Sequence, residues 1–298
     1  MNLEARREPV TIFCMSSPTH NRYPYSPIPA RAVYDWPDGK RLAVYIGLNL
    51  EWFSFGHLGA ELAPGGPQPD VLNYAWRDYG NRVGVFRLAE LFAELRLPVS
   101  LLINSEMYRH APETVAAFAD AELVGHGRTN SERQGELSEY EERLLIEETT
   151  AAIERHSGKR PRGWLGPWIS QSPLTPDLLQ EAGYRYLLDW CHDDQPVWMK
   201  TRHGRILSVP YPQELNDIPQ IVARKREGPD FADMIVDAFE VMHEECAKRP
   251  LVMGIALHAM IAGQPFRLRH LRRAFAHIHA KRDQCWLTTA GQIADCMR

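Results

Sequence analysis

Residues 42–50 read LAVYIGLNL, and Glu51 and Trp52 follow directly. The run contains no charged residue, which is typical of a β-strand covered by other elements on both faces. Asn49 and Glu51 share one side of this chain by the two-residue period of a strand, whereas Trp52 points away. The stretch therefore predicts a buried strand that carries a carboxylate at its carboxyl end.

Further runs of strand length follow along the chain, at 97–104, 122–126, 162–167, 184–189, 206–211, 251–258 and 285–289. Amphipathic stretches between them predict helices at 82–96, 139–156, 175–183, 230–247 and 267–281. Ser138 and Glu141 form a capping box before the second of these helices, and Thr175 is the expected N-cap of the third. This alternation predicts an α/β fold with parallel strands, either a distorted (β/α) barrel or, as the alternative, a doubly wound open sheet.

Two segments of unequal size make up the expected domain organisation. Residues 1–38 are rich in Pro, Tyr, Arg and Ser without any lasting period, and we expect an ordered N-terminal arm packed on the domain, because so many aromatic residues are unusual in a disordered tail. No internal repeat or Gly/Ser linker follows. Residues 39–298 are therefore predicted to form a single catalytic domain.

Composition and charge restrict the partners. The 298 residues carry a net charge of −4, which gives no basic surplus for phosphate contacts and argues against nucleic acid. No stretch approaches the roughly 18 apolar residues of a membrane span, and the N-terminus does not match a secretory signal, so we expect a cytoplasmic protein. The five cysteines are widely spaced without a C-x-x-C pair. A small molecule is the expected partner.

In a parallel barrel, catalytic and binding side chains collect at the carboxyl ends of the strands. The residues near these ends are Asn49, Glu51 and Trp52, then Asn104, then His126, Arg128 and Asn130, then Trp164 and Trp168, then Asp189, and last His258. We expect Glu51, His126 and His258 to meet around one cavity. Taken alone, each histidine also fits a hydrogen-bonded core residue, and GWLGPW also fits aromatic packing around a turn.

The order of several segments resembles the polysaccharide deacetylase superfamily, and within it the branch of metal-independent allantoinases and cyclic imide hydrolases. These segments include WPDGKRLAVYIGLNLEW, DVLNYAWRDYGNRVGVFRL, GHGRTNSE, GWLGPWISQSPLTPDLLQEAGYRYLLDW and IALHAMIAGQPFRLRHL. They cover nearly the whole chain. The resemblance implies a distorted barrel of about seven parallel strands and hydrolysis of a non-peptide carbon–nitrogen bond. It also implies a homo-oligomer, either a dimer or a tetramer.

The chain departs from the metal-dependent members of that superfamily. Those members have an Asp-Asp pair after the first strand and His-x-x-x-His later, whereas Glu51-Trp52 and His126-x-x-x-Asn130 stand here. An indole does not replace a carboxylate ligand. Another register makes Glu51, His126 and Asn130 the donors, which is a poor zinc site. We favour a reaction without a catalytic metal, and a divalent metal such as zinc is the alternative.

Residue roles follow from the chemistry of an amide or imide. We expect Glu51 to take the proton of the attacking water, with its basicity raised by burial beside Trp52. His126, with Asn49 or Asn130, would hold the carbonyl oxygen, and the resemblance implies that His258 protonates the leaving nitrogen. The expected substrate contacts are Asn49, Trp52, Asn104, Arg128, Asn130, Trp164, Trp168 and Asp189.

Two other functions stay open at this point. One is a metal-dependent N-deacetylase that acts on a sugar or another N-acyl compound. The other is a non-catalytic ligand-binding member of the superfamily.

Overall fold

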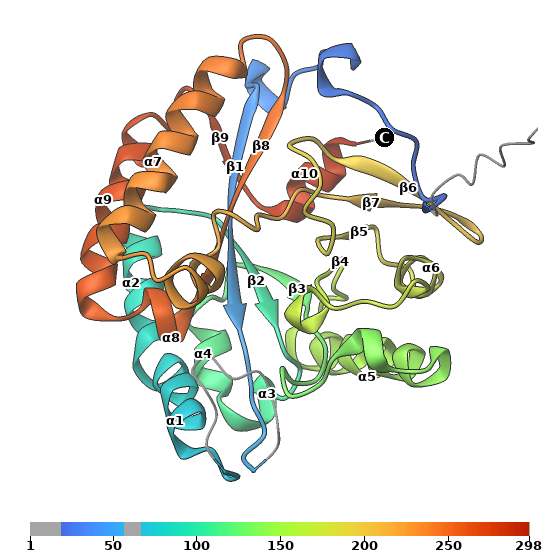
Figure 1. The fold of residues 1–298 in the computed structure, drawn as a ribbon, viewed down its shortest axis with the longest axis vertical. Coiled ribbons are helices and arrows are strands. Elements are labelled where there is room, and N and C mark those ends of the chain that lie inside the picture. The colour runs from blue at the N-terminus through green and yellow to red at the C-terminus, as the bar shows by residue number, and fades with distance from the viewer. Residues whose placement is uncertain (1–18, 57–66, 298) are drawn as a thin grey trace, which may run out of the picture.

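The computed structural model describes residues 19–56 and 67–297 (Figure 1). Strands and helices alternate along most of this chain, and the parallel strands form one curled sheet. The strands are β1 Leu42–Leu50, β2 Val99–Ile103, β3 Glu122–Gly125, β4 Gly163–Trp164, β5 Tyr186–Leu187, β6 Val197–Thr201, β7 Gly204–Ser208, β8 Leu251–His258 and β9 Trp286–Thr288.

The order of the strands confirms the distorted (β/α) barrel. Seven parallel strands run in the order β7-β5-β4-β3-β2-β1-β8, and β9 also pairs with β1 in parallel. The curl is nearly closed by a parallel bridge between Asn216 and Ala256, which joins the segment after β7 to β8. The antiparallel strand β6 was not predicted. It extends the sheet beyond β7 through a hairpin.

Side chains of β1 alternate between two hydrophobic cores. Leu48 and Leu50 belong to the core under the outer helices, whereas Ala43 and Tyr45 belong to the core inside the curled sheet. Asn49 and Glu51 continue the inner row because successive strand residues point to opposite faces. Burial of both rows explains why the run has no charge before its end.

Helices cover the outer face of the sheet. Figure 1 shows α7 and α9 side by side on one side of the molecule and α5 and α6 on the other. The helices are α1 Val71–Tyr79, α2 Val85–Glu94, α3 Met107–His110, α4 Pro112–Ala116, α5 Glu139–Ser157, α6 Thr175–Glu181, α7 Gly228–Glu245, α8 Ala259–Ala262, α9 Pro265–Ala280 and α10 Ala290–Cys296. None of them has both the length and the apolar character that a membrane crossing needs.

Helix boundaries agree with the predictions in part. The capping box of Ser138 and Glu141 is present at the start of α5. The helix predicted at 82–96 begins instead as the π-helical turn Gly80–Gly84, which joins α1 to α2. Thr175 is not an N-cap: it is the first residue of α6, and its hydroxyl donates to the buried Glu142 carboxylate. The hydroxyl of Thr175 therefore donates to this buried carboxylate, although the local pattern predicted that it would cap the helix.

Residues 19–38 lie against the barrel, and residues 1–18 fall outside the described chain. Arg31 forms a bidentate ion pair with Asp193, with N–O distances of 2.7 and 2.6 Å. The Trp36 side chain is 2% exposed and donates its indole N–H to the carbonyl of Leu251. These contacts attach the described part of the arm at both the β5–β6 connection and the start of β8.

Candidate active site

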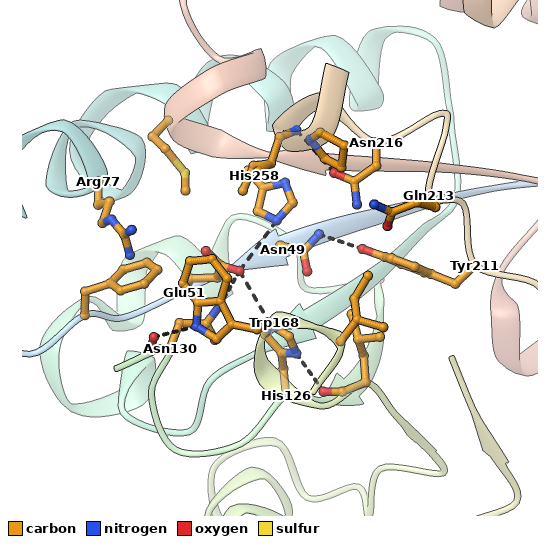
Figure 2. A pocket seen from close by; sticks show the side chains of 16 residues that line it. Asn49, Glu51, Arg77, His126, Asn130, Trp168, Tyr211, Gln213, Asn216 and His258 are labelled. Carbon is orange, nitrogen blue, oxygen red and sulfur yellow. Dashed lines mark hydrogen bonds and ion pairs between the residues drawn. The ribbon is translucent and has the colours of Figure 1, made fainter. Parts of the chain in front are cut away.

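A cavity of about 170 Å³ lies at the carboxyl end of the strands (Figure 2). Glu51 follows the last residue of β1, His126 follows β3, and His258 is the last residue of β8. All three side chains line the cavity, and they converge as the strand order predicts. Asn49, Asn130 and Trp168 line it too.

The carboxylate of Glu51 is the point where the polar side chains meet. Its Oε1 atom lies 2.6 Å from Asn130 Nδ2 and 3.5 Å from the Nε2 atoms of both His126 and His258. Glu51 is 8% exposed. A buried carboxylate needs such partners, because an unpaired charge in this position would be costly. Figure 2 shows the two imidazoles on opposite sides of Oε1.

Asp217 holds His258 from the side away from Glu51. Its Oδ1 lies 2.7 Å from His258 Nδ1, and its Oδ2 accepts the main-chain N–H of His258 at 2.8 Å. The Asp217 side chain is fully buried. This two-point contact orients the imidazole so that Nε2 faces Glu51 and the cavity.

Glu51 and His258 shift each other's pKa. Burial alone would raise the pKa of Glu51, but the charge of His258 outweighs it and holds that pKa well below its usual range. Burial alone would lower the pKa of His258, but Asp217 and Glu51 raise it to about 10. Glu51 is therefore ionised and His258 protonated at neutral pH. The expectation that burial makes Glu51 more basic is wrong, because the protonated imidazole of His258 stabilises its charge.

One hydrogen bond fixes the orientation of the His126 ring. Its Nδ1 lies 2.7 Å from the carbonyl oxygen of Leu165, which can only accept, so Nδ1 carries the proton. In the neutral ring, Nε2 is then an acceptor. This atom is buried without a hydrogen-bond partner among the described residues, and 3.5 Å from Glu51 exceeds a normal hydrogen bond. Nε2 would need a second ring proton to donate to a carbonyl oxygen as we expected.

Two amide side chains of the cavity already donate to protein groups. Asn49 Nδ2 contacts the Tyr211 hydroxyl at 3.0 Å and the Leu257 carbonyl at 3.2 Å. Asn130 Nδ2 donates to Glu51, while its Oδ1 accepts from Asn104 Nδ2 at 3.0 Å. Asn49 thus offers no free donor to a carbonyl oxygen, contrary to the sequence-based expectation, and Asn130 gives one of its two N–H groups to Glu51.

The orientations of these side chains do not fit a divalent ion of the kind used by the metal-dependent members of the superfamily. The donors considered for such an ion were Glu51, His126 and Asn130, yet Asn130 presents its nitrogen to the cavity and its oxygen to Asn104. Reversing that amide would set two N–H groups against each other. Within residues 19–56 and 67–297, no three His, Cys, Asp or Glu side chains group to hold a metal.

Several predicted substrate contacts lie outside the cavity. The Trp52 ring stacks on His110 with 4.1 Å between centroids, as its position on the opposite side of the strand dictates. Asn104 is fully buried and accepts the Trp52 main-chain N–H at 2.8 Å. Arg128 is bound by Glu132 and Glu148 at the surface. Trp52, Asn104 and Arg128 therefore do not line this cavity.

Trp164 and Asp189 are structural as well. Trp164 is fully buried and donates its indole N–H to Gln134, so the packing interpretation of GWLGPW holds for this ring. Asp189 accepts the main-chain N–H of Gly166 at 2.8 Å. Only Trp168 of this group reaches the cavity, where its indole N–H donates to the Asn130 carbonyl at 2.9 Å.

Other lining residues were missed by the sequence analysis. They include Phe53, Arg77, Tyr211, Gln213 and Asn216, and Asp217 stands behind His258. The residues at 211–217 follow the sixth predicted strand, so their position at a strand end was the available signal. Arg77 gave none, because it comes from α1, which was not predicted; its guanidinium carbon lies 3.4 Å from the centre of the Phe53 ring.

Comparisons with known proteins agree with this architecture. No protein-family model matches the chain. A "Putative polysaccharide deacetylase" of Schizosaccharomyces pombe is 30% identical over 241 residues, which are 73% of this chain and 73% of that protein.

Two solved structures share the fold over almost the whole chain. The "probable Polysaccharide deacetylase" of Pseudomonas aeruginosa PAO1 has a TM-score of 0.79 at 27% identity, and it covers 91% of this chain and 93% of its own. The "Puue Allantoinase" structure has a TM-score of 0.78 at 27% identity with the same coverage. The chain belongs to the polysaccharide deacetylase superfamily.

Proposed function

We propose that this protein hydrolyses the carbon–nitrogen bond of a small amide, cyclic imide or ureide without a catalytic metal. One observation carries the proposal. Glu51 lies beside two imidazoles, each 3.5 Å from the same oxygen, and His258 on one side is protonated, so its Nε2 has no lone pair to give to a metal. The opposite charges of Glu51 and His258 provide a base and an acid in one cavity.

The reaction follows from these positions. Glu51 removes a proton from water, and His126 Nε2 accepts a hydrogen bond from the same water and orients it. The water oxygen adds to the carbonyl carbon, and His258 Nε2 gives its proton to the nitrogen as the carbon–nitrogen bond breaks. The proton on Glu51 then passes to His258 across the 3.5 Å between them, which restores both groups. A linear amide gives a carboxylic acid and an amine, whereas opening of a cyclic imide or ureide gives one molecule that carries a carboxylic acid and an amide or urea nitrogen.

The size and walls of the cavity support a single small ring as the substrate. Its volume of about 170 Å³ is below the range of about 300–1,000 Å³ that encloses drug-sized ligands. Trp168, Phe53 and Tyr211 provide flat surfaces, and Asn49, Gln213 and Asn216 provide amide groups. Cyclic imides and ureides combine a flat ring with alternating N–H and C=O groups. Their leaving nitrogens also depart more easily than that of an acetamide, so a Lewis acid is less needed.

A substrate screen on chelator-treated protein tests the proposal. Cyclic imides, hydantoins, allantoin and N-acetyl sugars should be compared for the parent, for Glu51→Gln and for the surface control Glu132→Gln. We expect metal-independent turnover of a cyclic compound, a loss of about 10²–10⁴-fold in kcat for Glu51→Gln, and parent activity for the control. Equal turnover by Glu51→Gln and the parent would show that Glu51 is not the base.

A metal-dependent N-deacetylase is the second candidate. The name of the Schizosaccharomyces pombe relative supports a deacetylase, and the metal is part of this second proposal. It predicts stoichiometric metal in protein purified without added ions. It also predicts that a chelator abolishes release of acetate from an N-acetyl sugar and that zinc restores it. The metal-free mechanism predicts that the same chelator leaves turnover unchanged.

A further inference from the structure

The π-helical turn Gly80–Gly84 touches the main chain beside both members of the proposed acid–base pair. It joins α1 to α2 and lies close to the cavity without lining it through its own side chains. π-turns of this kind are rare and occur often at functional sites. The contacts of three of its residues, Gly80, Asn81 and Gly84, indicate what this turn does.

Asn81 holds the residue that acts as the proposed base. Strand β1 ends at Leu50, so the main chain of Glu51 lies beyond the sheet ladder. The peptide group between Glu51 and Trp52 is instead held by two side-chain amides. Asn81 Nδ2 donates to the Glu51 carbonyl at 2.9 Å, and Asn104 Oδ1 accepts the Trp52 N–H at 2.8 Å. One peptide unit is thus fixed at both of its polar atoms.

The glycines of the same turn contact the chain that follows His258. Helix α8 begins at Ala259, directly after His258. A Cβ atom on Gly80 would lie 2.7 Å from the main-chain nitrogen of Met260, and one on Gly84 would lie 2.2 Å from the carbonyl oxygen of Ala259. No side chain fits at either place, so the two backbones pack directly against each other.

We propose that the Gly80–Gly84 turn is a positioning element that sets the separation of Glu51 and His258, with Asn81 as its positioning residue. The proposal rests on the proposed function for its kinetic consequence. The sheet already aligns Asn49 with His258 as neighbours in β1 and β8. Glu51 lies two residues further on, beyond that pairing, and the turn connects it to the chain after His258. The 3.5 Å between Glu51 Oε1 and His258 Nε2 therefore depends on this turn.

The kinetic test compares Asn81→Ala with Arg82→Ala in the full chain. Arg82 is the next residue in the turn, and its side chain is 74% exposed in a surface pair with Asp78, which makes it a matched control. We expect kcat to fall about 10- to 100-fold in Asn81→Ala while KM stays within about twofold, because the cavity walls are unchanged. We expect parent values for Arg82→Ala. A raised KM with unchanged kcat would overturn the proposal.

A second measurement does not need activity. In protein with ¹⁵N-labelled histidine, the imidazole signals of His258 can be assigned by their absence in His258→Gln. We expect Asn81→Ala to move the His258 Nε2 signal in the same direction as Glu51→Gln, and Arg82→Ala to leave it in place. The isosteric variant Asn81→Asp, which cannot donate to the Glu51 carbonyl, should do the same if Asn81→Ala fails to fold.

The two measurements separate the two proposals. If no carbon–nitrogen substrate is turned over by the parent, the proposed function fails, and the His258 signal still tests the positioning role. If the parent is active and Asn81→Ala keeps both its kcat and its His258 signal, the positioning role fails and the proposed function stands.

Discussion

His258 depends on Asp217 for both its orientation and its charge. Asp217 contacts the ring nitrogen and the main-chain N–H of the same residue, and it is the first of the groups that raise the pKa of His258 against the lowering effect of burial. Asp217 lies seven residues after Pro210, and no local sequence pattern there indicates that its carboxylate orients a histidine. The residue became recognisable only when the β7–α7 connection was seen beside β8.

Replacing Asp217 with Asn should move the alkaline limit of activity. The amide keeps the size of the side chain but removes the negative charge, so the pKa of His258 falls from about 10. The proposed acid then loses its proton at lower pH, and kcat/KM at pH 9 should drop at least about tenfold. A pH profile of kcat/KM measures this shift. An unchanged alkaline limb would show that His258 is not the group that titrates.

At the scale of elements, the turn Gly166–Ile169 brings Trp168 to the cavity. Trp168 has a φ of 68° and Ile169 a φ of 55°, which are left-handed conformations that side chains with a Cβ rarely adopt. Such a turn needs support from its surroundings. Asp189, at the end of β5, supplies part of it through the main-chain N–H of Gly166. The residue expected to contact substrate instead supports the loop that carries Trp168.

Asp189 should make the stability of this loop depend on pH. Burial is the main cause that raises the pKa of its carboxyl from 3.8 to about 7. A raised carboxyl pKa favours folding at low pH, and this contribution is lost as pH rises from about 3.8 through about 7. Asp189→Asn cannot ionise. The free energy of unfolding of Asp189→Asn, measured relative to that of the parent, should therefore rise by about 1–3 kcal/mol from pH 5 to pH 8.

Urea unfolding at the two pH values measures this difference, and any pH-independent cost of the amide cancels in the comparison. Asp120→Asn, at an exposed position, is the control and should change equally little at both. If the Asp189→Asn difference is the same at pH 5 and pH 8, then Asp189 does not titrate in this range.

At the scale of the whole molecule, the arm and the barrel share one core. Trp36 belongs to the hydrophobic cluster inside the curled sheet, together with Tyr45 of β1 and Ile293 of α10. We therefore propose that residues 19–38 unfold together with the barrel. The expected homo-oligomer and the cytoplasmic location remain predictions.

Trp36→Ala should destabilise the entire chain. Removal of this buried ring costs about 3–5 kcal/mol in the free energy of unfolding, since a large cavity is left and the Leu251 carbonyl loses its donor. Tyr25→Ala is the control in the same arm, because Tyr25 is 91% exposed and should change stability by less than about 0.5 kcal/mol. Urea unfolding followed by circular dichroism measures both. A small loss in Trp36→Ala would mean that the arm is dispensable for the barrel.

Strand positions could be predicted from the chain because burial on two faces imposes long apolar runs, and the runs 42–50 and 251–258 match β1 and β8 closely. The convergence of Glu51, His126 and His258 followed from the same rule, since parallel strands place their carboxyl ends at one edge. The two-residue period also placed Trp52 on the outer side, although we expected it to contact substrate.

Proton affinities, hydrogen-bond directions and supporting residues required the folded chain. The pKa of Glu51 is low because the charged imidazole of His258 at the end of β8 stands beside it, and Asn49 and Asn130 donate to partners distant in sequence. Asp217, Asn81 and Arg77 come from connections and helices without a marked local pattern. Apolar periodicity is a property of the local sequence. Electrostatic and hydrogen-bond partners, in contrast, meet only when folding brings distant segments together.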